Sequence, residues 1–382
     1  MDPLSNKYIN WSDGMKISQK HLHELQNIVE EKSRDSIATQ APKDGFGILP
    51  AGHEGKKPLD YMLRLEGENA LSLELRQCRA ITPSGNRVEL LTGSAHEGKN
   101  VLKGRLELEK AGLVNSSSLF VALRYMSGEM EPFGLPDSNE SPPRLPYTSP
   151  RLQLELMPGD ADPKLYHHCV IVARMSVQNG VMSHDESYIP PSLAMSGHDA
   201  LKEFAFKYIQ FLQELENNAF AVVRNIARKD TLTPLAESVN TYVREVIASI
   251  QHHFDFLEMF GERLHPAHFL LNAKQLARGM KNSIEMLRSD SKEELLNYFQ
   301  DVIELGPAEY MGVNAAVHNA QYSHYNIRKS LEAILEFCKV NGKLMTELSH
   351  LDYIGKKKKT GIFVGEVTRD EETPKPKKRW DF

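Results

Sequence analysis

The sequence predicts an α+β protein with more than one domain, in which an antiparallel β-sandwich or barrel precedes a bundle of long helices. Three observations predict this class. Apolar and polar residues alternate between about residues 45 and 190, which is the period of a strand. After residue 190, apolar residues recur every three or four positions, which is the period of a helix. The chain has 382 residues, which is more than one ordinary hydrophobic core accommodates.

Composition excludes several other classes. The apolar fraction of 41% and the charged fraction of 25% are those of a globular protein. The net charge of −5, from 46 basic and 51 acidic residues, provides no basic field for nucleic acid. Three widely spaced cysteines are typical of a reducing compartment. No signal peptide and no run of ~20 apolar residues is seen, so we expect a cytoplasmic location.

The first predicted elements are a short extended segment and one helix. The run from Tyr8 to Trp11 has the character of a strand. Ser18 is a favoured N-cap residue for a helix from Gln19 to about residue 38. The spacing predicts one apolar stripe along this helix, formed by Leu22, Leu25, Val29 and Ile28.

Period-two patterns and turn signals predict several strands between residues 45 and 190. Leu71, Leu73 and Leu75 alternate with polar residues, and Leu152, Leu154 and Leu156 do the same. Residues 119–123 and 169–173 are continuous apolar runs, as in strands buried on both faces. Asn179-Gly180 separates two extended runs and predicts a hairpin turn.

One stretch in this β-rich part, about residues 127–150, is predicted to be irregular. Six prolines fall within it, and proline cannot donate to a strand ladder or continue a helix. Long ordered loops are often functional. Two interpretations stay open, a surface insert and an arm that contacts a partner.

The helical part begins after Pro190-Pro191. Apolar spacing predicts helices over about 198–228, 235–260, 266–287, 291–303 and 309–349. A forty-residue helix would be roughly 60 Å long. Helices of this length pack as an antiparallel bundle, or as a bundle that also oligomerises.

The last 28 residues differ from the rest in charge. Residues 355–382 hold nine basic and five acidic residues, a net of +4. Within this tail, residues 361–367 have the pattern of one isolated strand, and the basic run at 356–359 is typical of a solvated linker.

The sequence holds no catalytic motif that rises above chance. Phosphate-binding loops, dinucleotide fingerprints, nucleophile elbows and the HExxH zinc motif are all missing from it. Two Glu-x-x-His pairs, Glu262/His265 and Glu347/His350, resemble half of a carboxylate-bridged di-metal site. A di-metal bundle enzyme is therefore an alternative. The main expectation is a non-enzymatic protein with no catalytic residues, no cofactor and no bound metal.

Five motifs in collinear order resemble the TssK family, the baseplate subunit of type VI secretion systems. Residues 9–22 read INWSDGMKISQKHL, beside the family opening W-x-E-G-[ML]-x-L-x-P-Q-H-F; here Ser18 stands at the usual proline. The other matches are Gly45-Phe46-Gly47, the turn at 81–86, the Ile-Pro-Pro junction at 188–193, and His265-Pro266 with Leu276-Ala277-Arg278-Gly279. The resemblance covers about residues 8–350.

The resemblance implies a structural baseplate adaptor of a type VI-like contractile machine. It implies a β-rich shell domain over 1–193, a helical-bundle neck over 194–352 and, here, a short basic tail over 353–382 in place of a head domain. The implied partners are TssF-like and TssG-like wedge proteins, further copies in a homotrimer, and a membrane complex reached through the tail at the inner face of the inner membrane. A phage-type tail or receptor-binding protein is the other alternative.

The resemblance also suggests site residues. For baseplate contact we expect Trp11, Met15, Ile17, Leu22, Pro142 and Pro143. For the trimer interface we expect Leu201, Phe204, Tyr208, Phe211 and Leu215. For docking of the tail we expect Ile362, Phe363 and Val364.

Overall fold

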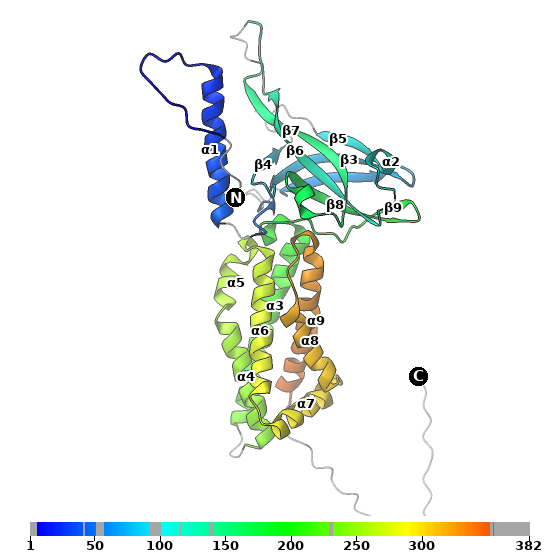
Figure 1. Cartoon of the computed structure of the whole chain (residues 1–382). Coiled ribbons are helices and arrows are strands. Elements are labelled where there is room, and N and C mark those ends of the chain that lie inside the picture. The colour runs from blue at the N-terminus through cyan, green and yellow to red at the C-terminus, as the bar shows by residue number, and fades with distance from the viewer. Residues whose placement is uncertain are drawn as a thin grey trace, which may run out of the picture.

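The computed structural model describes residues 6–40, 43–50, 57–91, 101–114, 116–136, 141–228, 232–351 and 354. Its two parts are a β region (residues 43–193) and a helical region (residues 194–354), which meet at one junction (Figure 1). About half of the structure is helical, and both sheets are antiparallel. The predicted α+β class is confirmed.

The β region consists of two sheets. The first contains β1 (Gly47–Ile48), β2 (Leu59–Leu65), β3 (Ala70–Ile81), β4 (Arg87–Leu90) and β5 (Leu102–Glu107). The other four strands each pair with the long β3. The second has the order β7-β6-β8-β9, from β6 (Ser118–Phe133), β7 (Tyr147–Pro158), β8 (Cys169–Gln178) and β9 (Val181–His184). The short helix α2 (Leu108–Ala111) lies between the two sheets in sequence.

The core of the β region lies between the sheets and confirms the period-two prediction. Leu71, Leu73 and Leu75 of β3 are buried against apolar residues of β6 and β8. The hairpin predicted at Asn179-Gly180 is also confirmed, because both residues have positive φ (53° and 79°) between β8 and β9. Positive φ at both central positions is what a tight hairpin turn requires.

The irregular stretch is shorter than predicted. The β6–β7 ladder continues past a register shift between Met126 and Met130, and ends at the pair Phe133↔Tyr147. Prolines are tolerated there because β7 is an edge strand and β8 pairs with β6 only as far as Arg124. These strands form an arm (described residues 127–136 and 141–150) that projects away from the helical region (Figure 1).

The helical region packs around one apolar core. Its helices are α3 (Asp199–Ala227), α4 (Pro234–Gln251), α5 (Phe254–Phe260), α6 (Pro266–Glu285), α7 (Ser289–Ile303), α8 (Pro307–Asn319) and α9 (Ile327–Ser349). Short 3-10 turns are η1 (Pro163–Tyr166) in the β region, and η2 (Met195–Gly197), η3 (Gly261–Arg263) and η4 (His324–Asn326) in the helical region. Proline at the first position of α4, α6 and α8 suits a helix start, since its missing N–H needs no partner there.

Two predicted helices are wrong in length. The helix expected over 309–349 is interrupted between Asn319 and Ile327, where Tyr322 and His324 turn into the junction. The helix expected over 235–260 is interrupted at His252 and His253. Within the described ranges, no helix is long and apolar enough to cross a membrane.

The N-terminal prediction is half correct. The helix α1 (Gln19–Gln40) begins where Ser18 predicts it. The strand expected at Tyr8 to Trp11 is wrong, since this segment pairs with no strand and lies along α1 instead.

Candidate functional site

Several motifs behind the family resemblance meet at the junction between the two regions. The backbone N–H of Ile48 donates to Pro191 O at 2.7 Å, and the N–H of Leu193 donates to Ile48 O at 2.8 Å. Gly47 has φ +110°, and a Cβ added there would overlap the Pro191 carbonyl. The close approach of the Gly45-Phe46-Gly47 and Ile-Pro-Pro motifs therefore depends on a glycine at position 47.

Two histidines complete the junction from the helical side. The Nε2 atom of His265 lies 3.1 Å from Asp44 O, and the Nε2 atom of His324 lies 2.8 Å from Phe46 O. Their rings stack with centroids 5.0 Å apart. His265 Nδ1 accepts from the Ala267 N–H and caps α6. Both rings are therefore neutral donors to the segment that enters β1.

Burial accounts for the titration of this pair. It lowers the pKa of His324 to about 3, a change that the hydrogen bond to Phe46 opposes and the neighbouring His265 reinforces. Burial also lowers the pKa of His265. His324 is not among the expected site residues. The sequence predicts that it lies inside a helix, and no local pattern indicates that its ring contacts the β region.

The N-terminal segment (residues 6–18) runs back along α1. The Asn6 N–H donates to Glu31 Oε2 at 2.9 Å, and Lys32 Nζ lies 4.4 Å from the centroid of the Tyr8 ring. Near the start of the helix, the rings of Trp11 and His21 lie 6.2 Å apart. The segment and the helix therefore form one unit.

This unit exposes most of the apolar residues expected for baseplate contact. Trp11, Ile17 and Leu22 are exposed (49%, 62% and 52%), and Met15 is half-buried. Of the predicted apolar stripe on α1, Leu22, Leu25 and Val29 are exposed and Ile28 is buried. On its other side α1 is held by Arg34 Nη1, which donates to Asn86 Oδ1 at 2.9 Å.

The arm carries the other two expected contact residues. Pro142 and Pro143 are both exposed near its tip. Other apolar residues of the arm, which the proline pattern did not single out, are also exposed: Met130, Leu135, Leu145 and Tyr147. Arg151 bridges Glu129 and Glu131 at the base of the arm, at 2.9 and 3.5 Å. In Figure 1 the arm rises from the β region on the side away from the helical region, and α1 runs beside the β region with its N-terminal end pointing the same way.

The residues expected at the trimer interface lie inside the chain's own core. Leu201, Phe204, Tyr208 and Leu215 are at most 8% exposed. Phe211 is half-buried against Phe337, with ring centroids 6.4 Å apart. This stripe faces α4, α6 and α9 because the helical region needs a core of its own, so contact between copies through α3 would have to use its opposite face. The residues expected for tail docking, Ile362, Phe363 and Val364, lie outside the described residues.

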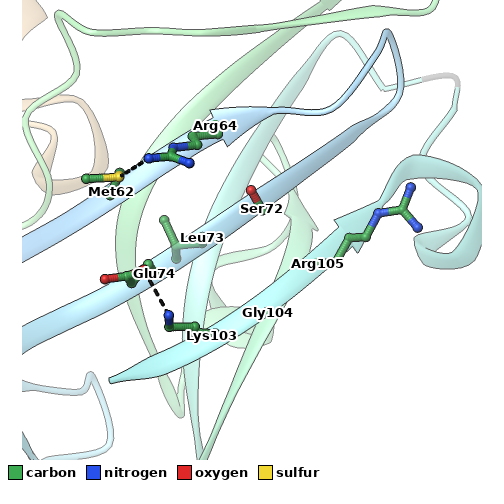
Figure 2. A pocket seen from close by; sticks show the side chains of 8 residues that line it. All are labelled: Met62, Arg64, Ser72, Leu73, Glu74, Lys103, Gly104 and Arg105. Atoms are coloured by element: carbon green, nitrogen blue, oxygen red, sulfur yellow. Dashed lines mark hydrogen bonds and ion pairs between the residues drawn. The ribbon is translucent and has the colours of Figure 1, made fainter. Parts of the chain in front are cut away.

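The outer face of the first sheet has a shallow hollow of about 310 Å³ (Figure 2). Its charged side chains are Arg64, Glu74, Lys103 and Arg105. Lys103 Nζ lies 3.2 Å from Glu74 Oε2, and Arg105 pairs with Glu66 and Glu107. Hydrogen bonds from Arg76 and Lys103 lower the pKa of Glu74. These exposed ion pairs form a solvated sheet face.

The two Glu-x-x-His motifs cannot share a metal site. His265 starts α6 at the junction, while His350 follows the far end of α9 (Figure 1). In the described part of the chain, no three His, Cys, Asp or Glu side chains gather as metal ligands.

Comparison with known proteins identifies similar folds. No protein-family model matches the chain, and no curated protein matches it. Several solved structures are similar to it. One, described as the crystal structure of TssK, shares 16% identity at a TM-score of 0.51 and covers 90% of this chain and 72% of that chain. A chain of the baseplate complex from the type VI secretion system shares 13% identity at a TM-score of 0.54 and covers 90% of this chain and all of that one.

These likenesses define the class of the fold. In this chain a two-sheet β region is joined to a region of long helices. At this level of identity the fold alone is shared, and it is a TssK-like fold.

Proposed function

We propose that this chain is a structural, non-enzymatic baseplate component of a type VI-like contractile secretion machine. The observation that carries the proposal is the TssK-like fold over 90% of the chain. Three of the sequence motifs support it independently, since residues in or next to them (47–48, 191–193 and 265) meet at one junction. On this proposal, residues 1–193 act as the shell, 194–352 as the neck and 353–382 as a basic tail.

The contact surface for TssF-like and TssG-like wedge proteins is the unit of α1 with its N-terminal segment, together with the arm. Exposed Trp11, Ile17 and Leu22 support this assignment, because large apolar side chains in contiguous exposed patches are typical of protein–protein contacts. Met15 is half-buried in the N-terminal segment, and Pro142 and Pro143 are exposed on the arm. The arm and the N-terminal end of α1 point in the same direction, so one partner can contact both of them (Figure 1).

The proposed assembly is a cytoplasmic homotrimer at the inner face of the inner membrane. The wedge proteins lie at the arm end, and the tail at 353–382, through Ile362, Phe363 and Val364, docks on the membrane complex. The net charge of +4 on the tail supports an acidic docking partner.

Co-purification from the native host tests this function. A tagged full-length chain is isolated, and the bound proteins are identified by mass spectrometry. We expect wedge proteins that resemble TssF and TssG, and membrane-complex proteins only while the tail is intact. Recovery of a capsid or tail-fibre assembly in their place would favour the receptor-binding alternative.

A further inference from the structure

The strand β2 forms an open edge of the first sheet. It pairs with β3 on one side, and among the described residues no strand pairs with it on the other. Its seven residues include neither proline nor glycine, whereas β7, an edge strand of the second sheet, carries Pro150 and Pro158. Proline, charges and bulges are the usual protection of an edge against pairing with another chain. The protection of β2 therefore depends on its two charged residues, Asp60 and Arg64.

The backbone of β2 presents alternate residues to the open edge. At the turn between β2 and β3, the Glu66 N–H donates to Ala70 O at 2.9 Å. Hydrogen-bonded and non-hydrogen-bonded pairs alternate along an antiparallel ladder, so the even-numbered residues of β2 direct their backbone groups toward β3. The N–H and C=O groups of Tyr61, Leu63 and Leu65 therefore point toward the open edge, where an added strand would find them.

The sequence of β2, LDYMLRL, is self-complementary when it lies antiparallel to a second copy of itself. With Met62 opposite Met62, the other pairs are Leu59 with Leu65, Asp60 with Arg64, and Tyr61 with Leu63. Each apolar residue meets an apolar residue, and the acid meets the base. Opposite charges directly across two strands stabilise their pairing, and like charges destabilise it. Centring the pair on Asp60 or on Arg64 instead would set like charges against each other, so the charges select one register.

Both charges are free to make this contact. Asp60 and Arg64 are exposed, and neither forms an ion pair within the described ranges. The hydrogen bond of Arg64 Nη2 goes to the Met62 sulfur at 3.2 Å. Lys57 acts on Asp60 electrostatically but forms its ion pair with Asp199.

The neighbouring cations on the outer face of this sheet differ from Arg64, which Figure 2 shows on the strand at the side of the hollow. Arg76 and Lys103 pair with Glu74, and Arg105 pairs with Glu66 and Glu107. Arg64 is thus left with a charge that an acidic residue of an added strand would neutralise. Asp60 of a second copy is such a residue.

We propose that β2 pairs antiparallel with β2 of a second copy of this chain, across a two-fold axis at Met62. Tyr61 of each copy exchanges backbone hydrogen bonds with Leu63 of the other, and the two first sheets become one continuous sheet. This is strand addition at a sheet edge, and the same surface serves both copies. The pairing does not rest on the proposed baseplate role. It uses none of the surfaces assigned to the wedge proteins.

Charge exchange tests the pairing on the full chain. Arg64→Asp sets acid against acid on both sides of the axis, and Asp60→Arg sets base against base. We expect sedimentation velocity to give each variant half the mass of the wild type. The control is Lys164→Asp, which makes the same change in net charge as Arg64→Asp at an exposed residue of η1 and should keep the wild-type mass.

The double variant Asp60→Arg with Arg64→Asp restores opposite charges across the axis. We expect it to regain the wild-type mass, and an equal mixture of the two single variants to regain it as well. Such recovery is specific to pairing of the strand with itself, because any other partner would meet reversed charges. If the single changes halve the mass and the double variant does not recover it, self-pairing is wrong.

A cysteine at the axis gives a second readout. In a non-hydrogen-bonded antiparallel pair the Cα atoms lie about 4.5 Å apart, which is within the range that a disulfide spans. Under mild oxidation, Met62→Cys should yield about tenfold or more disulfide-linked dimer than Ser72→Cys, which lies on the same face but on the central strand β3. The native cysteines are buried or half-buried. Equal yields from the two variants would contradict the pairing.

The masses also separate this pairing from the proposed trimer. Six chains in the wild type and three in Arg64→Asp would support both, and two chains against one would support the pairing alone. If the wild type has three chains and Arg64→Asp leaves that mass unchanged, the pairing is wrong and the trimer stands. A wild type with the mass of one chain would overturn both, while co-purification of wedge proteins still tests the baseplate role.

Discussion

The Nε2 atom of His324 lies 2.8 Å from the carbonyl oxygen of Phe46, and this bond joins two segments that are 278 residues apart. Phe46 also places its ring edge-on to His324, with centroids 4.5 Å apart. On the other side, His324 Nδ1 accepts from the Tyr322 hydroxyl at 2.8 Å. One buried ring therefore connects the entry of the β region to the interruption between α8 and α9.

Replacing His324 with alanine should weaken the junction. The change leaves the Phe46 carbonyl and the Tyr322 hydroxyl without their partner in a buried site, and an unsatisfied buried polar group costs about 1–3 kcal/mol. We expect the free energy of unfolding to fall by roughly 2–4 kcal/mol in urea denaturation, since a cavity is added to the lost bonds. His167→Ala, an exposed histidine, should change it by less than about 0.5 kcal/mol. Equal effects of the two changes would show that the junction bond is not important.

The same histidine should make stability depend on pH. Its ordinary pKa of 6.5 is lowered to about 3 by burial in the folded chain. Between pH 6.5 and 3 only the unfolded chain takes up the proton. The stability that the neutral His324 ring contributes is therefore complete above pH 6.5 and is lost progressively as pH falls toward 3. We expect the urea midpoint to drop between pH 7.5 and 5.0, and to drop less in His324→Gln, whose amide nitrogen still donates to Phe46 but does not titrate. Parallel pH curves for the two proteins would contradict this role.

Gly47 is expected to be intolerant of any side chain. Its φ of +110° is unfavourable for other residues, and an added Cβ would overlap the backbone carbonyl of Pro191, which cannot move aside cheaply. Gly47→Ala should therefore cost about 3 kcal/mol or more. Gly67→Ala is the matched control, because Gly67 also has a positive φ (+74°) but no atom within 4 Å of the added Cβ. There we expect only the conformational cost of roughly 1 kcal/mol. Thermal unfolding of both variants measures the difference.

The sequence predicted the fold class, the sheet core and most helix starts because these depend on local period and caps. Leu71, Leu73 and Leu75 alternate and are buried as expected. The break at 320–326 was missed because the apolar spacing continues on both sides of it. What interrupts the helix is a tertiary contact, His324 with Phe46, which no local pattern records.

Site prediction from sequence is limited where one pattern has two possible partners. Three-and-four spacing on α3 and on α1 indicates an apolar face but not what covers it. On α3 the apolar face, with Tyr208 and Leu215, proved to be the chain's own core. On α1 the same spacing left Leu22 and Val29 exposed.

The exposed face of α1 yields the most direct test of partner contact. Leu22→Ser removes an apolar side chain that is 52% exposed, so the free energy of unfolding should change by less than about 0.5 kcal/mol. If this face binds a wedge protein, affinity should fall about tenfold or more, since truncation of a buried interface anchor typically costs over 1 kcal/mol. The control is Leu165→Ser, which alters a leucine of similar exposure (53%) on η1 and should leave binding unchanged. Binding is measured by interferometry with the wedge proteins recovered from the host. Unchanged affinity in Leu22→Ser, with wild-type binding intact, would assign the contact to the arm instead of α1.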